Sequence, residues 1–276
     1  MATTSKSDEG ALINELVDAL KNRFGDPPEI GIVLGSGWGA RAKGLIGKSE
    51  EMQLDELPHW PAPSIEGHSP SLVVGDVAGR RIALSGGRTH AYEGLPAREL
   101  VRGVRSLVHW GAPSVLLLNA AGSLQAGRSP GSLMPFLDHI NVNLPDPNAA
   151  NQTADSRPLF LNTINLYDSQ WREKICSQCP DLEPGVYVGL QGPSYETPHE
   201  VELFRGYGGA AVGMSTIPEA LAARGAGAKV MAISLLTNFA AGIEGGNPSH
   251  QEVLEAARTH AGSAMDVLMA AVQSAP

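Results

Sequence analysis

The first part of the chain carries apolar residues at helical spacing. Between residues 8 and 24 they recur three and four positions apart, which predicts one amphipathic helix. The positions are Leu12, Ile13, Leu16, Val17 and Leu20. Gly25 and the pair Pro27-Pro28 are typical of a helix end, so we expect the helix to end there.

Short apolar runs and helical segments alternate after this helix. Strands are expected at residues 30–34, 71–77, 80–85, 114–118 and 229–236. The second and third should form a hairpin that turns at Ala78-Gly79, and Pro96 should open a helix that ends near Gly111. Strands that alternate with helices are typical of an α/β domain, and no repeat, charge block or linker divides the sequence.

Capping boxes mark three helix starts in the second half of the chain. In each box a Ser or Thr is followed three residues later by a Glu. The boxes are Thr197-Pro198-His199-Glu200, Thr216-Ile217-Pro218-Glu219 and Ser249-His250-Gln251-Glu252. The polar segment 146–157 is expected to be a long surface loop, which is either a functional lid or a plain connection.

Composition and charge narrow the class of protein. The 276 residues are 42% hydrophobic and 18% charged, so a folded core is expected. The net charge of −9 argues against nucleic-acid and anionic-membrane partners, because both need a basic face. The sequence shows neither a signal peptide nor an apolar run long enough for a transmembrane helix. Two cysteines, Cys176 and Cys179, exclude a disulfide scaffold and indicate a reducing compartment, so we expect a cytoplasmic protein.

A glycine-rich turn follows the first expected strand. In Gly35-Ser36-Gly37-Trp38-Gly39 the backbone N–H groups and the Ser36 hydroxyl suit an anion. The same segment also fits a tight turn without a ligand, or a loose dinucleotide fingerprint. The turn alone does not decide between these functions.

A basic segment follows the hairpin. Arg88 and His90 are two positions apart, so in extended backbone they point to one side, together with Tyr92. An Arg fork and a His donor on one side suit phosphate oxygens. The alternative is a solvated strand end in which Arg88 pairs with Glu93.

Polar residues near later strand ends suit a heterocyclic base. Glu196 offers acceptor atoms to ring N–H groups with Tyr195 as a stacking wall, or it only stabilises a helix N-terminus. Asn238 offers the donor and acceptor of a purine contact, or it makes an Asx turn. Ser215 lies near a helix N-terminus and suits an anion, whereas Met214 also suits core filling.

The candidates share a common placement. In open α/β sheets, ligands bind at the carboxyl ends of strands. The residues that follow expected strands at those ends are Ser36, Arg88, His90, Ala120, Ser215 and Asn238. We therefore expect them to line one pocket, while His68 and His250 are either ligand contacts or surface residues. Cys176 and Cys179 form a lone CxxC without partners, so no metal site is expected.

Seven motifs in series resemble one known family. They are GSGWG, EGH, GRTHAYEG, NAAGS, GPSYET, AVGMST and LLTNFAAGI. Their order and spacing from Ile30 to His250 resemble the trimeric, low-molecular-mass purine nucleoside phosphorylases. The resemblance implies a single nucleoside phosphorylase domain over residues 1–276, with a mixed, partly barrel-like central sheet flanked by helices, and a homotrimer. It also implies reversible phosphorolysis of purine (2′-deoxy)ribonucleosides, with orthophosphate as co-substrate and no cofactor.

The resemblance also implies roles for site residues. Phosphate contacts would come from Ser36, His68, Arg88, His90, the Ala120 backbone and Ser215. Nucleoside contacts would come from Tyr92, Tyr195, Glu196, Val212, Met214, Asn238 and His250. Catalytic roles fall to three of them. Asn238 and Glu196 would stabilise negative charge on the departing base, and His90 would help to hold phosphate beside an oxocarbenium-like sugar.

The chain also departs from the family pattern. Thr89 stands where an aromatic residue is common, and the loop 142–160 differs from the segment that normally supplies an aromatic residue to the neighbouring subunit's ribose pocket. Phe160 is a candidate for that aromatic residue.

Three other functions stay open at this point. A methylthioadenosine phosphorylase has the same fold, although Glu196 with Asn238 favours 6-oxopurines such as inosine and guanosine, and an Asp at position 238 would favour adenine. A non-catalytic nucleoside-binding protein would result if the altered loop had lost the ribose pocket. A dinucleotide-dependent oxidoreductase is supported by the turn at Gly35 alone.

Overall fold

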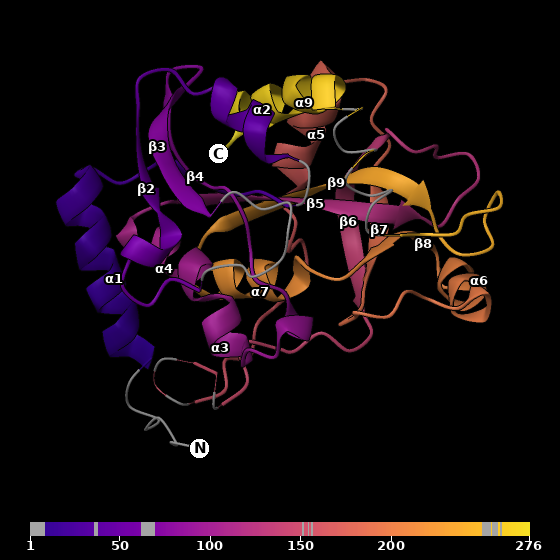
Figure 1. Cartoon of the computed structure of the whole chain (residues 1–276), viewed down its shortest axis with the longest axis horizontal. Helices are drawn as coiled ribbons and strands as arrows, with labels where there is room; N and C mark the ends of the chain where they lie inside the picture. Colours follow the sequence, from indigo (N-terminus) through magenta and orange to yellow (C-terminus); the bar gives the residue numbers. More distant parts are fainter. Residues whose placement is uncertain are drawn as a thin grey trace.

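The structure is a computed structural model, shown as a ribbon in Figure 1. It describes residues 9–35, 38–61, 70–150, 152–153, 155, 157–249, 255, 259 and 261–276. Three predicted site residues, Ser36, His68 and His250, lie outside the described residues, as does the third predicted capping box after Ser249.

The strands of the described chain join in one mixed sheet. They are β1 (Ile30–Val33), β2 (Ser49–Gln53), β3 (Ser71–Val77), β4 (Arg80–Ser85), β5 (Ser114–Ser123), β6 (Leu133–Asn141), β7 (Gly185–Gly189), β8 (Gly209–Gly213) and β9 (Lys229–Phe239). Their order is β2-β3-β4-β1-β5-β8-β7-β6-β9. Parallel pairs such as β1 with β5 occur beside antiparallel pairs such as β5 with β8.

Half of this sheet closes into a barrel. The last strand in the order, β9, also pairs in parallel with β5, from Ser114↔Lys229 to Ser123↔Phe239. This pairing joins β5, β8, β7, β6 and β9 into a closed ring of five strands. The predicted fold class, a mixed and partly barrel-like sheet flanked by helices, is confirmed.

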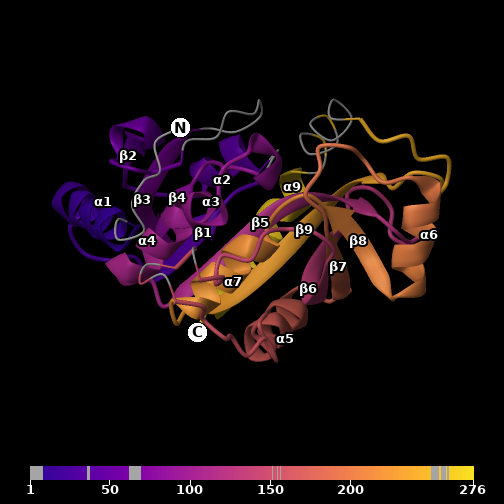
Figure 2. The same ribbon diagram turned by 90° about the horizontal axis from the view of Figure 1, so that it is seen from below.

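Helices cover the sheet on two sides. They are α1 (Glu9–Phe24), α2 (Gly39–Gly44), α3 (Ala97–Leu100), α4 (Arg102–Trp110), α5 (Ser169–Gln178), α6 (Pro198–Gly206), α7 (Ile217–Gly225) and α9 (Ala261–Ser274), with short 3₁₀ turns at Leu54–Glu56 and Ala91–Glu93. Figure 1 shows α2, α5 and α9 on one side of the central strands and α3, α4 and α7 on the other. Figure 2 shows α1 and α6 at opposite ends of the molecule.

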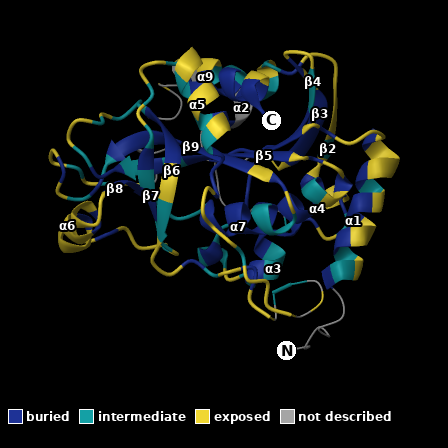
Figure 3. Ribbon diagram, turned by 180° about the vertical axis from the view of Figure 1, so that it is seen from behind, coloured by how far each residue is buried: buried dark blue, intermediate teal, exposed yellow. Residues whose placement is uncertain are grey.

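The core follows from this layering. Strand β9 is buried from Val230 to Asn238, and it is coloured accordingly in Figure 3. A second apolar cluster joins α1 to α4 and contains Leu16, Leu20 and Trp110. The predicted amphipathic helix is therefore confirmed over Glu9–Phe24, with its apolar face turned toward α4.

The predicted hairpin is also confirmed. Strands β3 and β4 pair antiparallel from Leu72↔Ser85 to Val77↔Arg80. The turn residues Ala78 and Gly79 have φ angles of 52° and 78°, the left-handed conformation that a tight two-residue hairpin turn requires.

The predicted helix from Pro96 to Gly111 is wrong in one respect, because it divides at Val101. Val101 has φ −104° and ψ 4°, so α3 ends before it and α4 begins after it. The side chain of Val101 is fully buried and β-branched, and such side chains are restricted in helices.

Two strands are longer than predicted, and this matters for the site. Strand β5 continues through Ser123, and β9 continues through Phe239. Both extensions arise because the two strands stay paired with each other and close the barrel, with one irregularity between Ala121 and Gly122. The segment after Leu118 is therefore strand, and Asn238 lies within a strand and not in a turn after it.

The described residues of the polar segment 146–157 form a loop, as predicted, and part of this loop is bound to a helix. Arg105 of α4 donates hydrogen bonds to the carbonyl oxygens of Pro147, at 2.7 Å, and Gln152, at 2.8 Å. Asn148 is buried. Its described part is thus anchored to α4 and does not project freely into solvent.

Candidate active site

A cavity lies where β5, β8 and β9 meet. The register of the strands places Gly122 beside both Val212 and Asn238. The cavity is lined by Gly35, Arg88, His90, Tyr92, Asn119, Ala120, Ala121, Gly122, Tyr195, Glu196, Val212, Gly213, Met214, Ser215, Thr237, Asn238 and Ala240. Every predicted site residue that the structure describes is in this set, and these residues come from widely separated parts of the chain.

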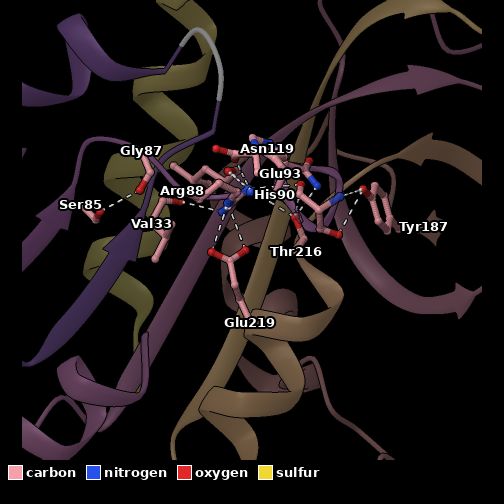
Figure 4. A network of polar contacts seen from close by, with 12 residues as sticks. Val33, Ser85, Gly87, Arg88, His90, Glu93, Asn119, Tyr187, Thr216 and Glu219 are labelled. Carbon is pink, nitrogen blue, oxygen red and sulfur yellow. Dashed lines mark hydrogen bonds and ion pairs between the residues drawn. The ribbon is translucent and has the colours of Figure 1, made fainter. Parts of the chain in front are cut away.

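Arg88 places a positive charge in the lining of the cavity. Its Nη1 donates to the Leu118 carbonyl at 2.8 Å, and its Nη2 donates to the Val33 carbonyl at 3.3 Å (Figure 4). Nη1 also lies 3.5 Å from Ser215 Oγ. The guanidinium is thus fixed by the end of β1 and the middle of β5, and it meets the Ser215 hydroxyl there.

A buried carboxylate, and not Glu93, pairs with Arg88. Arg88 Nε lies 3.0 Å from Glu219 Oε2 and donates to Oε1 at 3.2 Å. Glu93 instead accepts a hydrogen bond from the backbone N–H of His90 at 2.6 Å, and its Oε1 lies 3.4 Å from His90 Nδ1. The alternative of a solvated strand end is therefore wrong, because Arg88 is buried and bound to another element.

The second predicted capping box does not form. Thr216 begins α7 but makes no side-chain capping bond, and its φ of 74° is unusual for a β-branched residue. Its Oγ1 accepts from Asn119 Nδ2 at 2.8 Å and lies 3.4 Å from Arg88 Nη1. Both members of the predicted box, Thr216 and Glu219, are thus engaged by buried groups of the site. The first box, from Thr197 to Glu200, is confirmed.

Aromatic and thioether side chains also line the cavity. The rings of His90 and Tyr92 stack with their centroids 4.8 Å apart, and both residues line the cavity with Arg88, although Tyr92 lies in a 3₁₀ turn and not in the extended backbone that the prediction assumed. Burial is the main cause that raises the pKa of the Tyr92 phenol to about 12, so this group stays protonated and can donate a hydrogen bond. Met214 is half-buried and also lines the cavity.

Glu196 and Asn238 contribute a carboxyl group and an amide to the lining of the same cavity. Glu196 is buried, and burial is the main cause that raises the pKa of its carboxyl group above its ordinary value. Asn238 Oδ1 accepts from Thr237 Oγ1 at 3.0 Å, and its Nδ2 donates to the Phe239 carbonyl at 2.9 Å. Tyr195 also lines the cavity and is 41% exposed. The Asn238 amide is therefore oriented by its neighbours, in a cavity that also contains a carboxyl group able to accept hydrogen bonds.

Sequence reasoning missed three residues of the network around Arg88, namely Asn119, Thr216 and Glu219. Asn119 bonds both Thr216 and Ser234, and Glu219 pairs with Arg88. The motif Thr-x-x-Glu at the start of α7 was the signal, but the same pattern predicts a local capping box. Local spacing cannot distinguish the two.

Membrane and metal features are absent from the described residues. None of the helices in the described ranges combines the length and apolar character needed to cross a membrane. In the same part of the chain, His, Cys, Asp and Glu side chains do not gather in threes that could hold a metal ion.

Comparison with known proteins decides the family. The model of the phosphorylase superfamily matches residues 29–273. The purine nucleoside phosphorylase of Mycobacterium tuberculosis is 36% identical over 268 residues, which cover 97% of each chain. The purine nucleoside phosphorylase 1 of Bacillus subtilis is 37% identical, over 86% of this chain and 88% of that one. The chain belongs to the phosphorylase superfamily, in the family of the purine nucleoside phosphorylases.

Solved structures of this family agree with the fold. A schistosome purine nucleoside phosphorylase in complex with hypoxanthine superposes with a TM-score of 0.86 at 26% identity, over 99% of this chain and 100% of that one. The Schistosoma mansoni enzyme in complex with adenosine gives 0.85 at 27% identity, over 99% of both chains. The family resemblance of the motifs is thus confirmed, and the oxidoreductase alternative is not supported.

Proposed function

We propose that the protein catalyses the reversible phosphorolysis of purine ribonucleosides and 2′-deoxyribonucleosides. The products are the free base and (deoxy)ribose 1-phosphate. One observation carries the proposal: the cation and hydroxyl of Arg88 and Ser215 line the same cavity as the carboxyl group and amide of Glu196 and Asn238. Arg88 binds Leu118 of β5, whereas Asn238 pairs with Gly122 four residues further along that strand, so the phosphate and base contacts would lie apart along β5 with the sugar between them.

Phosphate would bind at the Arg88 end. Arg88, His90, Ser215 and Ala120 line the cavity, and the family resemblance adds Ser36 and His68. In the reaction the bond from C1′ to the purine nitrogen breaks and a bond from C1′ to a phosphate oxygen forms. The bound anion stabilises the oxocarbenium-like sugar before it becomes the nucleophile, and its fixed position supplies proximity. Orthophosphate is thus a co-substrate, and the reaction needs no cofactor.

The base would bind between Glu196 and Asn238. The carboxylate accepts from a ring N–H, and the amide donates to the purine as the departing base gains negative charge. Tyr195 and Val212 border the base, Tyr92 and Met214 border the sugar, and His250 is assigned near the 5′-hydroxyl by resemblance. Asn238 donates an N–H, which suits the oxygen of 6-oxopurines, so inosine and guanosine are the proposed substrates ahead of adenine nucleosides and methylthioadenosine.

We also propose a homotrimer that works in the cytoplasm. Phe160 is 92% exposed and Ile164 is 80% exposed, which supports a second copy of the chain as their cover. Phe160 is the candidate for the aromatic residue that reaches a neighbouring ribose pocket. The free cysteines, Cys176 and Cys179, support a reducing compartment. Light scattering of the purified protein measures the assembly, and a monomeric mass would contradict the trimer.

A single assay tests the activity. Inosine cleavage is followed with and without inorganic phosphate, and the sugar product is identified. We expect cleavage that requires phosphate and yields ribose 1-phosphate. Equal rates in both buffers would indicate a hydrolase, and calorimetric binding without base release would indicate a non-catalytic nucleoside-binding protein. A parallel assay with methylthioadenosine separates the remaining family alternative.

A further inference from the structure

Glu219 is a buried carboxylate outside the residues that line the active-site cavity. Arg88 lines that cavity, whereas Glu219 lines a separate, smaller cavity together with Trp60 and Thr89, and Arg88 borders both. Figure 4 shows Glu219 reaching the guanidinium from the first turn of α7. Arg88 therefore lies between the carboxylate and the space proposed for phosphate.

The Glu219 carboxylate neutralises the charge of the buried Arg88 guanidinium. The Arg88 and Glu219 side chains are 2% and 6% exposed, and the closest N···O distance is 3.0 Å. Among the described residues, the other groups that accept from Arg88 are neutral: the Val33 and Leu118 carbonyls and the Ser215 and Thr216 hydroxyls. A buried charge without a partner is costly, so Glu219 makes the buried guanidinium tolerable when no anion is bound.

An anion in the cavity would be a second negative charge on the same guanidinium. At the short separations and low effective dielectric of a protein interior, two like charges that share one cation repel appreciably. We propose that Glu219 is the resident counter-ion of Arg88 and lowers the affinity for phosphate by competing for its charge. The proposal rests on the phosphate site of the proposed function. It explains how phosphate and a sugar phosphate can leave a buried arginine, as a reversible reaction requires.

The geometry predicts the direction in which loss of the Glu219 charge changes the affinity for phosphate. Arg88 also donates to the Leu118 and Val33 carbonyls, at 2.8 and 3.3 Å, and neither acceptor involves position 219, so we expect both bonds to persist when its charge is removed. Glu219→Gln keeps the shape of the side chain and an acceptor oxygen for Nε. The substitution therefore removes charge with little change in the orientation of Arg88. Phosphate should bind the variant more tightly.

The chain contains a matched control. Glu9 Oε1 and Oε2 accept from Arg102 Nε and Nη2, both at 2.9 Å, and this pair is also buried. It joins α1 to α4 and does not border the active-site cavity. Glu9→Gln therefore removes an equivalent buried charge without touching the proposed phosphate site.

The experiment measures phosphate binding without turnover. Inorganic phosphate is titrated into wild type, Glu219→Gln and Glu9→Gln, with Kd from calorimetry and Tm at each concentration. Both variants should have a lower Tm than wild type in phosphate-free buffer. Glu219→Gln should bind phosphate at least about threefold more tightly and show a larger phosphate-dependent rise in Tm, whereas Glu9→Gln should keep the wild-type Kd.

The outcomes separate the two proposals. An unchanged or weaker phosphate Kd in Glu219→Gln overturns the inference, while phosphate-dependent cleavage by wild type keeps the proposed function. Absence of both phosphate binding and phosphate-dependent cleavage in wild type overturns the proposed function, and the inference with it. If Glu219→Gln is unfolded without phosphate, recovery of the fold in phosphate supports the inference, and an unfolded chain at high phosphate overturns it.

Discussion

Arg88 Nη1 lies 3.5 Å from Ser215 Oγ, although 127 positions separate the two residues in the sequence. The proximity arises because Arg88 follows β4 and Ser215 follows β8, on either side of the central strand β5. A cation and a hydroxyl donor thereby meet at the anion end of the cavity, which is the geometry that the proposed phosphate site requires.

Replacement of Arg88 should act on phosphate more than on the nucleoside. Arg88→Lys keeps a positive charge but loses the planar fork, so we expect the KM for phosphate to rise at least about tenfold. The KM for inosine should change by less than about threefold. Arg102→Lys alters another buried ion pair and is the control. Equal increases in both KM values for Arg88→Lys would place Arg88 outside the phosphate subsite.

Asn238 should contribute to the transition state. Its amide lines the base end, and loss of one hydrogen bond to a base that gains charge should lower kcat/KM for inosine at least about tenfold in Asn238→Ala. Asn238→Asp presents an acceptor and should shift the preference toward 6-aminopurines. Asn162→Ala, at an exposed residue, should leave turnover near the wild-type rate. Undiminished turnover in Asn238→Ala would remove this residue from the chemistry.

The raised pKa of Glu196 predicts that activity falls at acid pH. As the pH falls through that pKa, the carboxylate takes up a proton and no longer accepts from the purine N–H. Relative to Glu196→Gln, the wild-type kcat/KM for inosine should fall by up to about tenfold per pH unit on the acid side. Parallel pH profiles for the two proteins would show that Glu196 does not titrate in the reaction.

The raised pKa of Glu196 should also make the stability of the fold depend on pH, but with the opposite sign: stability falls as the pH rises. Burial raises the pKa of Glu196 in the folded state, so folding favours the protonated carboxyl group. The resulting contribution to the free energy of unfolding is fully present below the unfolded-state pKa. It is lost as the pH rises through the folded-state pKa. At neutral pH, Glu196→Gln should therefore raise Tm, by roughly 2 °C if about 1 kcal/mol is recovered. Thermal unfolding of wild type and variant across this pH range checks the sign, and a lower Tm in the variant would contradict it.

Gly35 should tolerate no side chain. A Cβ there would lie 2.7 Å from both Asn119 Cα and the Leu118 carbonyl oxygen, which are backbone atoms of β5. Gly35→Ala should therefore cost roughly 1–3 kcal/mol and lower Tm by several degrees. A Cβ on Gly206, at the end of α6, would meet nothing within 4 Å beyond its own helix backbone and chain neighbours in the described structure. Gly206→Ala should thus stay within about 0.5 kcal/mol of wild type, and equal Tm values for both variants would contradict the close approach at Gly35.

Much of the fold could be predicted from local pattern. The helix at Glu9–Phe24 follows from apolar spacing, and the hairpin at Ala78-Gly79 follows from alternating runs around a turn. The ends of β5 and β9 could not be predicted in this way, because pairing between them extends both strands. Small residues such as Gly122 favour a turn when read locally, and only the closed barrel keeps them in a strand.

The candidate site could likewise be predicted only in part from the sequence. Residue types at strand ends identified Arg88, Ser215, Glu196 and Asn238 as candidates, and the structure places all four at one cavity. The role of Glu219 was not accessible, since a Thr-x-x-Glu pattern predicts a capping box. A buried guanidinium contributed by a different element binds Glu219 instead.

The sequence by itself determined which residues carry charge, hydrogen-bonding groups and turn propensity, and in what order, because these are properties of each residue and its near neighbours. Tertiary structure alone decided which partner each buried polar group meets. Closure of the β5–β9 barrel sets distances between segments more than a hundred residues apart, and burial then makes every unpaired charge costly, so pairs such as Arg88 with Glu219 exist only in the folded chain.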